Sequence, residues 1–338
     1  MTYKNLWLAR NKAAIDKRLQ WLKNKPEGSL LFQPSGIHFV TVEKKQSLLR
    51  MALIDREGLT SDLVQSQLDL NNPLNLISPY SQAMLLSLVW QNEPERIYLA
   101  GFGGGRIPLV LHHYFSEAFI ECTDIDPTLI EIATQFFGVQ FDERLKLIIQ
   151  DGREYLARQE QNVRYDIILT DVILGNGYTP YRLATREFYE LCQTHLSDNG
   201  VVAVDLFQRE PFYAHKLKTL QSVFDCIYLC SLDVGNAVVI ATNGSPLDKS
   251  ELIARTQALQ DSHQFAFPLL EKALQVKLGD DLADCIPHFD QAQILTDTSP
   301  PVGYFDNLPS FNPIFTQGVS DRPCPCGSGK LFPDCHGL

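Results

Sequence analysis

The sequence has no excess of positive charge and no long apolar run, and each absence excludes a class of protein. There are 29 Lys and Arg against 40 Asp and Glu, for a formal net charge of −11. This balance argues against nucleic acid as the main partner, because phosphate binding depends on clustered cations. Residues 70–92 are uncharged, but Asn, Pro, Ser and Gln interrupt them, so they cannot span a membrane. Charges also interrupt the N-terminus, where no secretory signal is visible, and we expect a cytoplasmic protein.

Internal repeats and low-complexity tracts are also missing, which excludes solenoid and fibrous architectures. With 338 residues and 45% hydrophobic composition, the chain can bury a full core, and its length suggests two or three compact units. Residues 1–28 differ in charge: seven Lys or Arg against two acids leave +5 there and −16 over the rest. A basic amphipathic helix of this kind can contact RNA or a membrane, but we favour a solvated helix packed on its own domain.

The hydrophobic periodicity divides the chain into segments. We expect a basic helix within 1–28, a small antiparallel β domain over 29–78, and a helical extension and linker over 246–320. Between them, over 79–245, strand and helix patterns alternate, which predicts a parallel sheet covered by helices on both faces. The expected strands are 96–100, 118–123, 145–149, 165–170 and 200–206. The expected helices are 106–114, 127–137, 152–159, 185–197 and 211–223.

Two further apolar runs follow, Cys226–Leu232 and Ala237–Thr242. Only Asp233-Val234-Gly235-Asn236 joins them, and a link that short cannot cross over a sheet, so the two strands must be antiparallel. Five parallel strands and a terminal hairpin resemble the class I S-adenosylmethionine-dependent (Rossmann-like) fold, a doubly wound α/β sheet.

The first expected strand, Arg96–Ala100, stops abruptly in Gly101-Phe102-Gly103-Gly104-Gly105-Arg106. Such a turn lets backbone N–H groups approach a ligand because no Cβ blocks the way, and the following helix N-terminus adds partial positive charge. A dinucleotide fingerprint would have a third glycine near Arg106. The turn therefore indicates a cradle of nucleotide size, and a tight turn without a ligand is the alternative.

Acids follow the ends of the next strands, where ligands bind in open α/β sheets. Asp124 can accept hydrogen bonds from both hydroxyls of a ribose, while Asp126-Pro127 is suited to begin a helix. Asp151-Gly152 can bind the exocyclic amine of adenine or simply cap the next helix. Asp171 can take a proton from an attacking amine or hold that amine by charge. Asp205 is a further candidate acid.

Several ordered motifs together resemble the spermidine synthase-like family over roughly residues 29–300. The motifs are Val64-Gln65-Ser66, Leu68-Asp69-Leu70, Pro79-Tyr80-Ser81-Gln82-Ala83-Met84, Gly101-Phe102-Gly103-Gly104-Gly105, Asp124-Ile125-Asp126-Pro127, Asp151-Gly152, Tyr165-Asp166-Ile167-Ile168-Leu169-Thr170-Asp171, Ala184-Thr185-Arg186-Glu187-Phe188-Tyr189 and Leu295-Thr296-Asp297.

The resemblance implies a transferase that uses S-adenosylmethionine or its decarboxylated form, an amine or other small acceptor, and a homodimer. It implies that Asp124 binds ribose, that Asp151 binds adenine, and that Asp171 is the catalytic acid/base. The glycine turn would hold the side chain on the sulfonium. The candidate nucleoside-binding residues are Gly101, Gly103, Gly104, Gly105, Arg106, Asp124, Asp151 and Gly152. The candidate substrate-binding residues are Tyr80, Gln82, Asp205 and Tyr178, the last within an expected lid over 175–181.

The chain departs from the family at two acids. Aminopropyltransferases have a Gly-Gly-Gly-Asp-Gly turn and an Asp-x-x-Asp pair, and here Arg106 and Leu174 stand where two of those acids would be. A donor amine and a diamine acceptor would therefore meet fewer carboxylates, and a desolvated cation without a partner costs several kcal/mol. Arg106 can instead pair with the carboxylate of intact S-adenosylmethionine, which favours methyl transfer.

The C-terminal segment 321–338 gathers three of the eight cysteines, a metal-binding pattern in a reducing compartment rather than a disulfide framework. It resembles the SEC-C motif, a zinc-binding tail. That resemblance implies a closed tetrahedral zinc site made by Cys324, Cys326, Cys335 and His336, without which so short a segment has no core. The tail would serve as a stability clip or as a docking element for a protein.

Three functions remain open from the sequence. The first is a spermidine synthase-like transferase with Asp171 as acid/base. The second is a methyltransferase that uses S-adenosylmethionine and acts on an unidentified acceptor. The third is a non-catalytic adaptor that works through the zinc tail.

Overall fold

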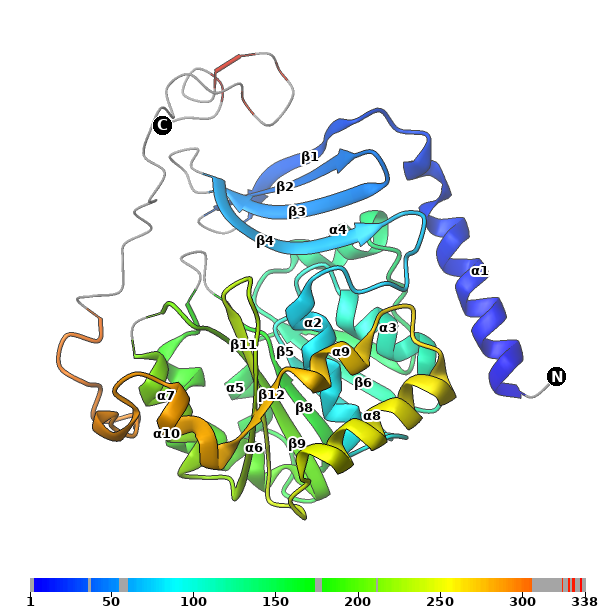
Figure 1. Cartoon of the computed structure of the whole chain (residues 1–338). Helices are drawn as coiled ribbons and strands as arrows, with labels where there is room; N and C mark the ends of the chain where they lie inside the picture. Colours follow the sequence, from blue (N-terminus) through cyan, green and yellow to red (C-terminus); the bar gives the residue numbers. More distant parts are fainter. Residues whose placement is uncertain are drawn as a thin grey trace.

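The computed structural model describes five main ranges of the chain and isolated residues of its tail (Figure 1). The ranges are residues 3–35, 38–54, 60–173, 178–210 and 212–305. The described tail residues are Cys324, Ser328, Lys330, Leu331 and Cys335. Within these residues no helix is long and apolar enough to cross a membrane. Residues 175–177 of the expected lid, and two of the four expected zinc ligands, Cys326 and His336, lie outside the described residues.

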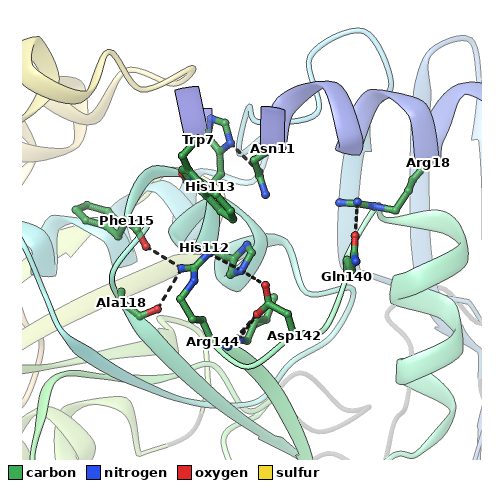
Figure 2. Close-up of polar contacts among 11 residues, drawn as sticks. Trp7, Asn11, Arg18, His112, His113, Phe115, Ala118, Gln140, Asp142 and Arg144 are labelled. Atoms are coloured by element: carbon green, nitrogen blue, oxygen red, sulfur yellow. Dashed lines mark hydrogen bonds and ion pairs between the residues drawn. The ribbon is translucent and has the colours of Figure 1, made fainter. Parts of the chain in front are cut away.

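The N-terminal helix α1 (Tyr3–Lys23) packs along the side of the molecule, as expected for a helix that covers its own domain. Its buried positions, spaced three or four residues apart, are Ile15, Leu19 and Leu22. Polar contacts fix it further (Figure 2). Trp7 donates from Nε1 to the backbone oxygen of His113 at 2.9 Å, and Arg18 donates to Gly138 O at 3.0 Å and to Gln140 Oε1 at 2.7 Å.

Four antiparallel strands follow in simple sequential order. They are β1 (Gly28–Ser35), β2 (His38–Lys45), β3 (Leu48–Ile54) and β4 (Thr60–Asp69). In Figure 1 this sheet lies over one end of the larger sheet of the molecule. The arrangement matters for function because it roofs the edge where the parallel strands end.

The central sheet has eight strands in the order β12-β10-β11-β9-β8-β5-β6-β7. The five parallel strands are β5 (Arg96–Ala100), β6 (Phe119–Asp124), β7 (Leu145–Ile149), β8 (Tyr165–Thr170) and β9 (Leu196–Phe207). The antiparallel strands are β10 (Cys226–Ser231), β11 (Asn236–Thr242) and β12 (Val276–Leu278). The predicted parallel sheet with a terminal hairpin is confirmed. The sequence did not predict the edge strand β12, because three residues are too few to show a hydrophobic periodicity.

Helices cover both faces of this sheet. Side chains of β5 alternate between two apolar clusters: Ile97 and Leu99 pack on one face, and Tyr98 and Ala100 on the other. The helices between the parallel strands are α3 (Arg106–Tyr114), α4 (Thr128–Phe136), α5 (Gly152–Ala157) and α6 (Arg186–Thr194), and α7 (Tyr213–Gln221) follows β9.

The remaining helices are short, apart from α8. They are α2 (Pro79–Met84), α8 (Lys249–His263), α9 (Leu269–Leu274) and α10 (Leu282–Cys285), with 3₁₀ turns η1 (Leu85–Val89), η2 (Tyr181–Leu183), η3 (Gly279–Asp281) and η4 (Phe289–Gln291).

Candidate active site

A cavity of about 710 Å³ lies at the carboxyl edge of the central sheet, beneath the N-terminal sheet. Its floor is made by the ends of β5, β6 and β8, which contribute Gly101, Asp124 and Asp171. The roof includes Met51 and Gln67 of the N-terminal sheet. Two of the acids predicted at strand ends, Asp124 and Asp171, therefore line the same cavity.

The glycine turn after β5 owes its shape to close packing. Gly101, Gly103 and Gly105 have φ values of 88°, 53° and 69°, a region that favours glycine. A Cβ added to Gly101 would lie 2.1 Å from the backbone oxygen of Asp171, so a side chain there would collide with the backbone just after β8. The turn is thus a requirement for bringing β5 and β8 together at the cavity floor.

The amides of this turn are bonded to the protein itself. Gly101 N donates to Thr123 O and Gly105 N to Phe102 O, both at 2.9 Å, and Gly104 N donates to Ser66 Oγ at 2.9 Å. The amides of residues 102 and 103 donate to Asp124. These N–H groups thus have partners within the protein, and the role of the turn in binding a nucleoside stays a prediction. Gly101 and Gly103 line the cavity, whereas Gly104 and Gly105 are not among the described lining residues.

Asp124, at the end of β6, connects the turn to the cavity. One oxygen of its carboxylate accepts from Phe102 N at 2.9 Å and the other from Asp126 N at 3.1 Å, and the Gly103 amide also donates to this carboxylate. Burial raises the pKa of Asp124, while these backbone donors favour its ionised form. The carboxylate lines the cavity and keeps acceptor capacity beyond its three backbone donors, so it can receive a hydroxyl group of a ribose.

Asp171 follows β8 directly, and its amide donates to Ala100 O at 2.8 Å, which ties it to β5. Burial raises the pKa of Asp171 to about 7, with a further contribution from the charge of Asp124, and a hydrogen bond from Tyr80 opposes the shift. Tyr80 comes from α2 and also lines the cavity. A carboxyl that titrates near neutral pH is suited to accept and release a proton.

Asp205 lies beside Asp171 because the register pairs Thr170 of β8 with Val204 of β9. The side chain is 1% exposed, and Asp205 is not among the described residues that line the cavity. Both of its oxygens accept from Asn236 Nδ2, at 3.1 and 2.9 Å. The carboxyl of Asp205 thus lies behind Asn236, and its contact with a substrate stays a prediction.

Arg106 begins α3 next to the turn and is almost fully buried. Its guanidinium donates to the backbone oxygens of Pro73, Asn75 and Phe137, which fixes the loop before α2 against the turn. Its Nε has no hydrogen-bond partner and its charge no ion pair among the described residues, and burial lowers the pKa of Arg106 to about 9. Arg106 lines the cavity, so a ligand bound there would meet a buried positive charge.

Three other predicted residues have structural contacts. Asp151 caps α5 by accepting from Glu154 N at 2.9 Å, and a Cβ on Gly152 would lie 2.9 Å from Ala100. Gln82 is buried and donates to Leu76 O at 2.5 Å. These three, and Tyr178, are not among the described residues that line the cavity. The substrate role of Gln82 and the adenine role of Asp151 both stay predictions.

Two residues of the site escaped prediction from the sequence. Ser66 accepts the Gly104 amide, and a Cβ on Gly104 would lie 2.6 Å from its hydroxyl, so this side chain shapes the turn from β4. Asn236 lines the cavity from the start of β11. Ser66 belongs to a motif of the family resemblance, and Asn236 to a hairpin connection, but neither pattern assigns a role to the side chain.

The described residues of the tail contact one another but do not form a group of metal ligands. Cys324 N donates to Lys330 O at 2.6 Å, and Cys335 Sγ lies 3.1 Å from Ser328 Oγ. No cluster of three or more His, Cys, Asp or Glu side chains that could hold a metal occurs among the described residues. The zinc site stays a prediction, since half of its ligands lie outside them.

The sequence of this chain is similar to those of known proteins. Residues 81–234 match the Spermine/spermidine synthase domain. A polyamine aminopropyltransferase of Vibrio vulnificus is 30% identical over 227 residues, which cover 66% of this chain and 74% of that protein.

Methyltransferases match as well. The eEF1A lysine and N-terminal methyltransferase of Bos taurus is 30% identical over 170 residues, 46% of this chain but only 24% of that longer protein. The crystal structure of human methyltransferase-like protein 13 in complex with SAH aligns with a TM-score of 0.52 and 28% identity, and covers 55% of this chain and 93% of that one.

Proposed function

This chain belongs to the polyamine aminopropyltransferase family and is a transferase, and from that premise we propose that it moves a group from a sulfonium nucleoside to an amine. The observation that carries the proposal is the placing of Asp124 and Asp171 in one cavity on either side of the glycine turn. Asp124 offers lone pairs for a ribose, and Asp171 offers a carboxyl that titrates near neutral pH.

The donor supplies an electrophilic carbon on a positively charged sulfur. The nitrogen of the acceptor forms a bond to that carbon as the carbon–sulfur bond breaks, and the electron pair stays on sulfur. Asp171 takes the proton that the nitrogen loses. Tyr80, which donates to Asp171, holds that carboxyl in position and favours its ionised form.

The transferred group depends on the charges around the donor. Arg106 is a buried cation beside the glycine turn without an ion-pair partner among the described residues, so it favours a donor that carries a carboxylate. A donor that presents only an ammonium group there would be repelled. We infer that the donor is intact S-adenosylmethionine and that the group is methyl.

Aminopropyl transfer is the second candidate, and membership of the aminopropyltransferase family favours it. In that case the donor is decarboxylated S-adenosylmethionine, and the acceptor is a small amine. Adenine would lie toward the end of β7, where Asp151 keeps one carboxylate oxygen beyond its helix-capping bond.

The test is a turnover assay with each donor and a panel of amines, with the products identified by mass spectrometry. Methylated product from S-adenosylmethionine supports the first candidate, and aminopropylated product from the decarboxylated donor supports the second. Asp171→Asn is the control, since it keeps the shape of the side chain and removes the base. Turnover by Asp171→Asn at the wild-type rate, or no product with either donor, would contradict the proposal.

The zinc tail adds a separate proposal. We propose that Cys324, Cys326, Cys335 and His336 bind one zinc ion, and that the tail acts as a clip or docking element outside the catalytic cavity. An adaptor function through this tail is compatible with catalysis, because the described residues that line the cavity all lie within 35–236.

A further inference from the structure

A second cavity lies beneath α1, separate from the candidate active site, and we call it the α1 cavity. Its volume is about 270 Å³, close to the smallest ligand pockets of about 300 Å³, and its described lining residues include none that line the larger cavity. The opposite wall from α1 includes Leu109 and His112 of α3. The other wall is a single face of α1, made by Trp7, Arg10, Asn11, Ala14, Ile15 and Arg18.

Contacts on both sides of the α1 cavity hold the helix in place (Figure 2). Toward the start of α1, Trp7 Nε1 donates to His113 O at 2.9 Å, and Asn11 Oδ1 lies 2.8 Å from His113 Nδ1. Toward its end, Arg18 Nε donates to Gly138 O at 3.0 Å. The helix therefore forms a fixed wall, and the space beneath it belongs to the folded structure.

Arginine side chains surround the α1 cavity without an acid to pair with. None of Arg10, Arg18 and Arg144 forms an ion pair among the described residues. Arg18 directs Nε and Nη1 to acceptors of the protein, so its Nη2 keeps both N–H groups for a ligand. Arg10 is exposed, and Arg144 lies behind Trp7, with its Cζ 4.6 Å from the centre of that ring.

Asp142 is the only acid among the described residues that line the α1 cavity, and its oxygens already have partners. Oδ1 accepts from the amides of Arg144 and Leu145, both at 2.9 Å, and Oδ2 lies 2.9 Å from Nε2 of His112. Burial lowers the pKa of His112, the charge of Arg144 lowers it further, and Asp142 opposes the shift, so His112 is neutral near neutral pH. Two lining arginines against one acid leave the cavity with a net positive charge.

We propose that the α1 cavity is a second ligand-binding site, which takes a small molecule with two negative charges on oxygen atoms of the phosphate or carboxylate type. Arg10 and the Nη2 group of Arg18 bind these oxygens by charge-assisted hydrogen bonds. The amide nitrogen of Asn11, whose oxygen faces His113, provides a further donor. This inference is independent of the proposed function, because it concerns another cavity.

The test is calorimetric titration of the full chain with inorganic phosphate, pyrophosphate and succinate, at constant ionic strength. We expect saturable binding of at least one of these probes, at one site per chain. Binding of phosphate or pyrophosphate without succinate supports a phosphate-bearing ligand, and binding of succinate alone supports a dicarboxylate. Binding of both kinds supports a site for dianions in general, and no saturable binding of any probe overturns the proposal.

Arg10→Gln should weaken the binding of the probe about tenfold, because a charge-assisted hydrogen bond is lost. Since Arg10 forms no ion pair among the described residues, this variant should keep the melting temperature of the anion-free protein. Arg18→Gln should also weaken binding about tenfold, for the same reason. An unchanged affinity in either variant overturns the proposal.

Lys23→Gln is the matched control. It removes an exposed cation from the end of the same helix, and Lys23 is not among the described residues that line the α1 cavity. We expect it to leave the affinity for each probe unchanged. If Lys23→Gln weakens binding as much as Arg10→Gln, the anion responds only to the net charge of the helix, and the proposed site is contradicted.

Discussion

Asp171 shows how burial can prepare a single carboxyl for catalysis. Removal from water raises its pKa to about 7, whereas a solvated aspartate stays ionised far below neutral pH. A base of this kind has a substantial fraction in each protonation state under ordinary conditions. The same shift has consequences for rate and for stability, and the two can be measured independently.

For the rate, turnover should rise with pH through about 7, because Asp171 must be ionised to accept a proton. Asp171→Asn should reduce turnover by about 10²–10⁴-fold and leave nucleoside affinity unchanged. A pH profile of kcat for wild type and variant checks both statements. A rate that is flat from about pH 5 to 9 would rule out this role for Asp171.

For stability, the folded pKa lies above the value of about 4 that is usual for an unfolded aspartate. The contribution of the protonated carboxyl is therefore complete below about pH 4 and lost as the pH rises through about 7. Asp171→Asn, which cannot ionise, should raise the free energy of unfolding at about pH 8 but not at about pH 4. Urea unfolding at both pH values provides the comparison, and equal effects at the two would contradict the predicted burial.

Arg106 is the residue that should discriminate between donors. Arg106→Gln should reduce the preference for S-adenosylmethionine over its decarboxylated form by about tenfold, because a charge-assisted hydrogen bond is lost. The ratio of the two affinities is the readout, since general loosening of the loop at Pro73 would weaken both donors together. An unchanged ratio would remove the reason for favouring methyl transfer.

At the level of elements, a buried ion pair that links the segment after β9 to α7 holds the backbone at Thr179. Glu210 and Lys216 contact each other, each 1% exposed. Glu210 accepts from Thr179 N at 3.2 Å, and Lys216 donates to Thr179 O at 3.4 Å. Both backbone groups of Thr179 are thus bound, which fixes the chain at this residue.

Breaking that pair should be costly. Lys216→Met should destabilise the protein by about 3–5 kcal/mol, because it leaves a buried carboxylate unpaired, and Glu210→Leu combined with Lys216→Met should recover most of the loss. Chemical unfolding of the single and double variants measures this. Equal stability of wild type and Lys216→Met would show that the pair is not buried as described.

The elements were largely predictable because periodicity is a local property. The alternation of β5 and the glycine stop at Gly101 are visible in the sequence, and so is the short link that makes β10 and β11 antiparallel. The site was less predictable, since it depends on which side chains meet. Asp205 and Asp171 occupy equivalent strand ends, yet Asn236 from a distant hairpin covers only one of them.

For the whole molecule, the chain combines a roofed catalytic cavity with a tail of different chemistry. We expect the purified protein to contain about one zinc ion per chain, as a Cys₃His site binds one metal. Elemental analysis measures it, and Cys326→Ser should remove the zinc without changing nucleoside affinity. Metal-free protein prepared without chelators would contradict the zinc prediction.

The central claim is that the cavity binds a sulfonium nucleoside through Asp124 and the glycine turn. Calorimetric titration of the wild type and Asp124→Ala with S-adenosylmethionine, its decarboxylated form and methylthioadenosine tests it most directly. We expect the wild type to bind these nucleosides, S-adenosylmethionine most tightly, and Asp124→Ala to bind none of them. A wild type that binds none of the three, or an Asp124→Ala variant that binds them as well as the wild type, would contradict it.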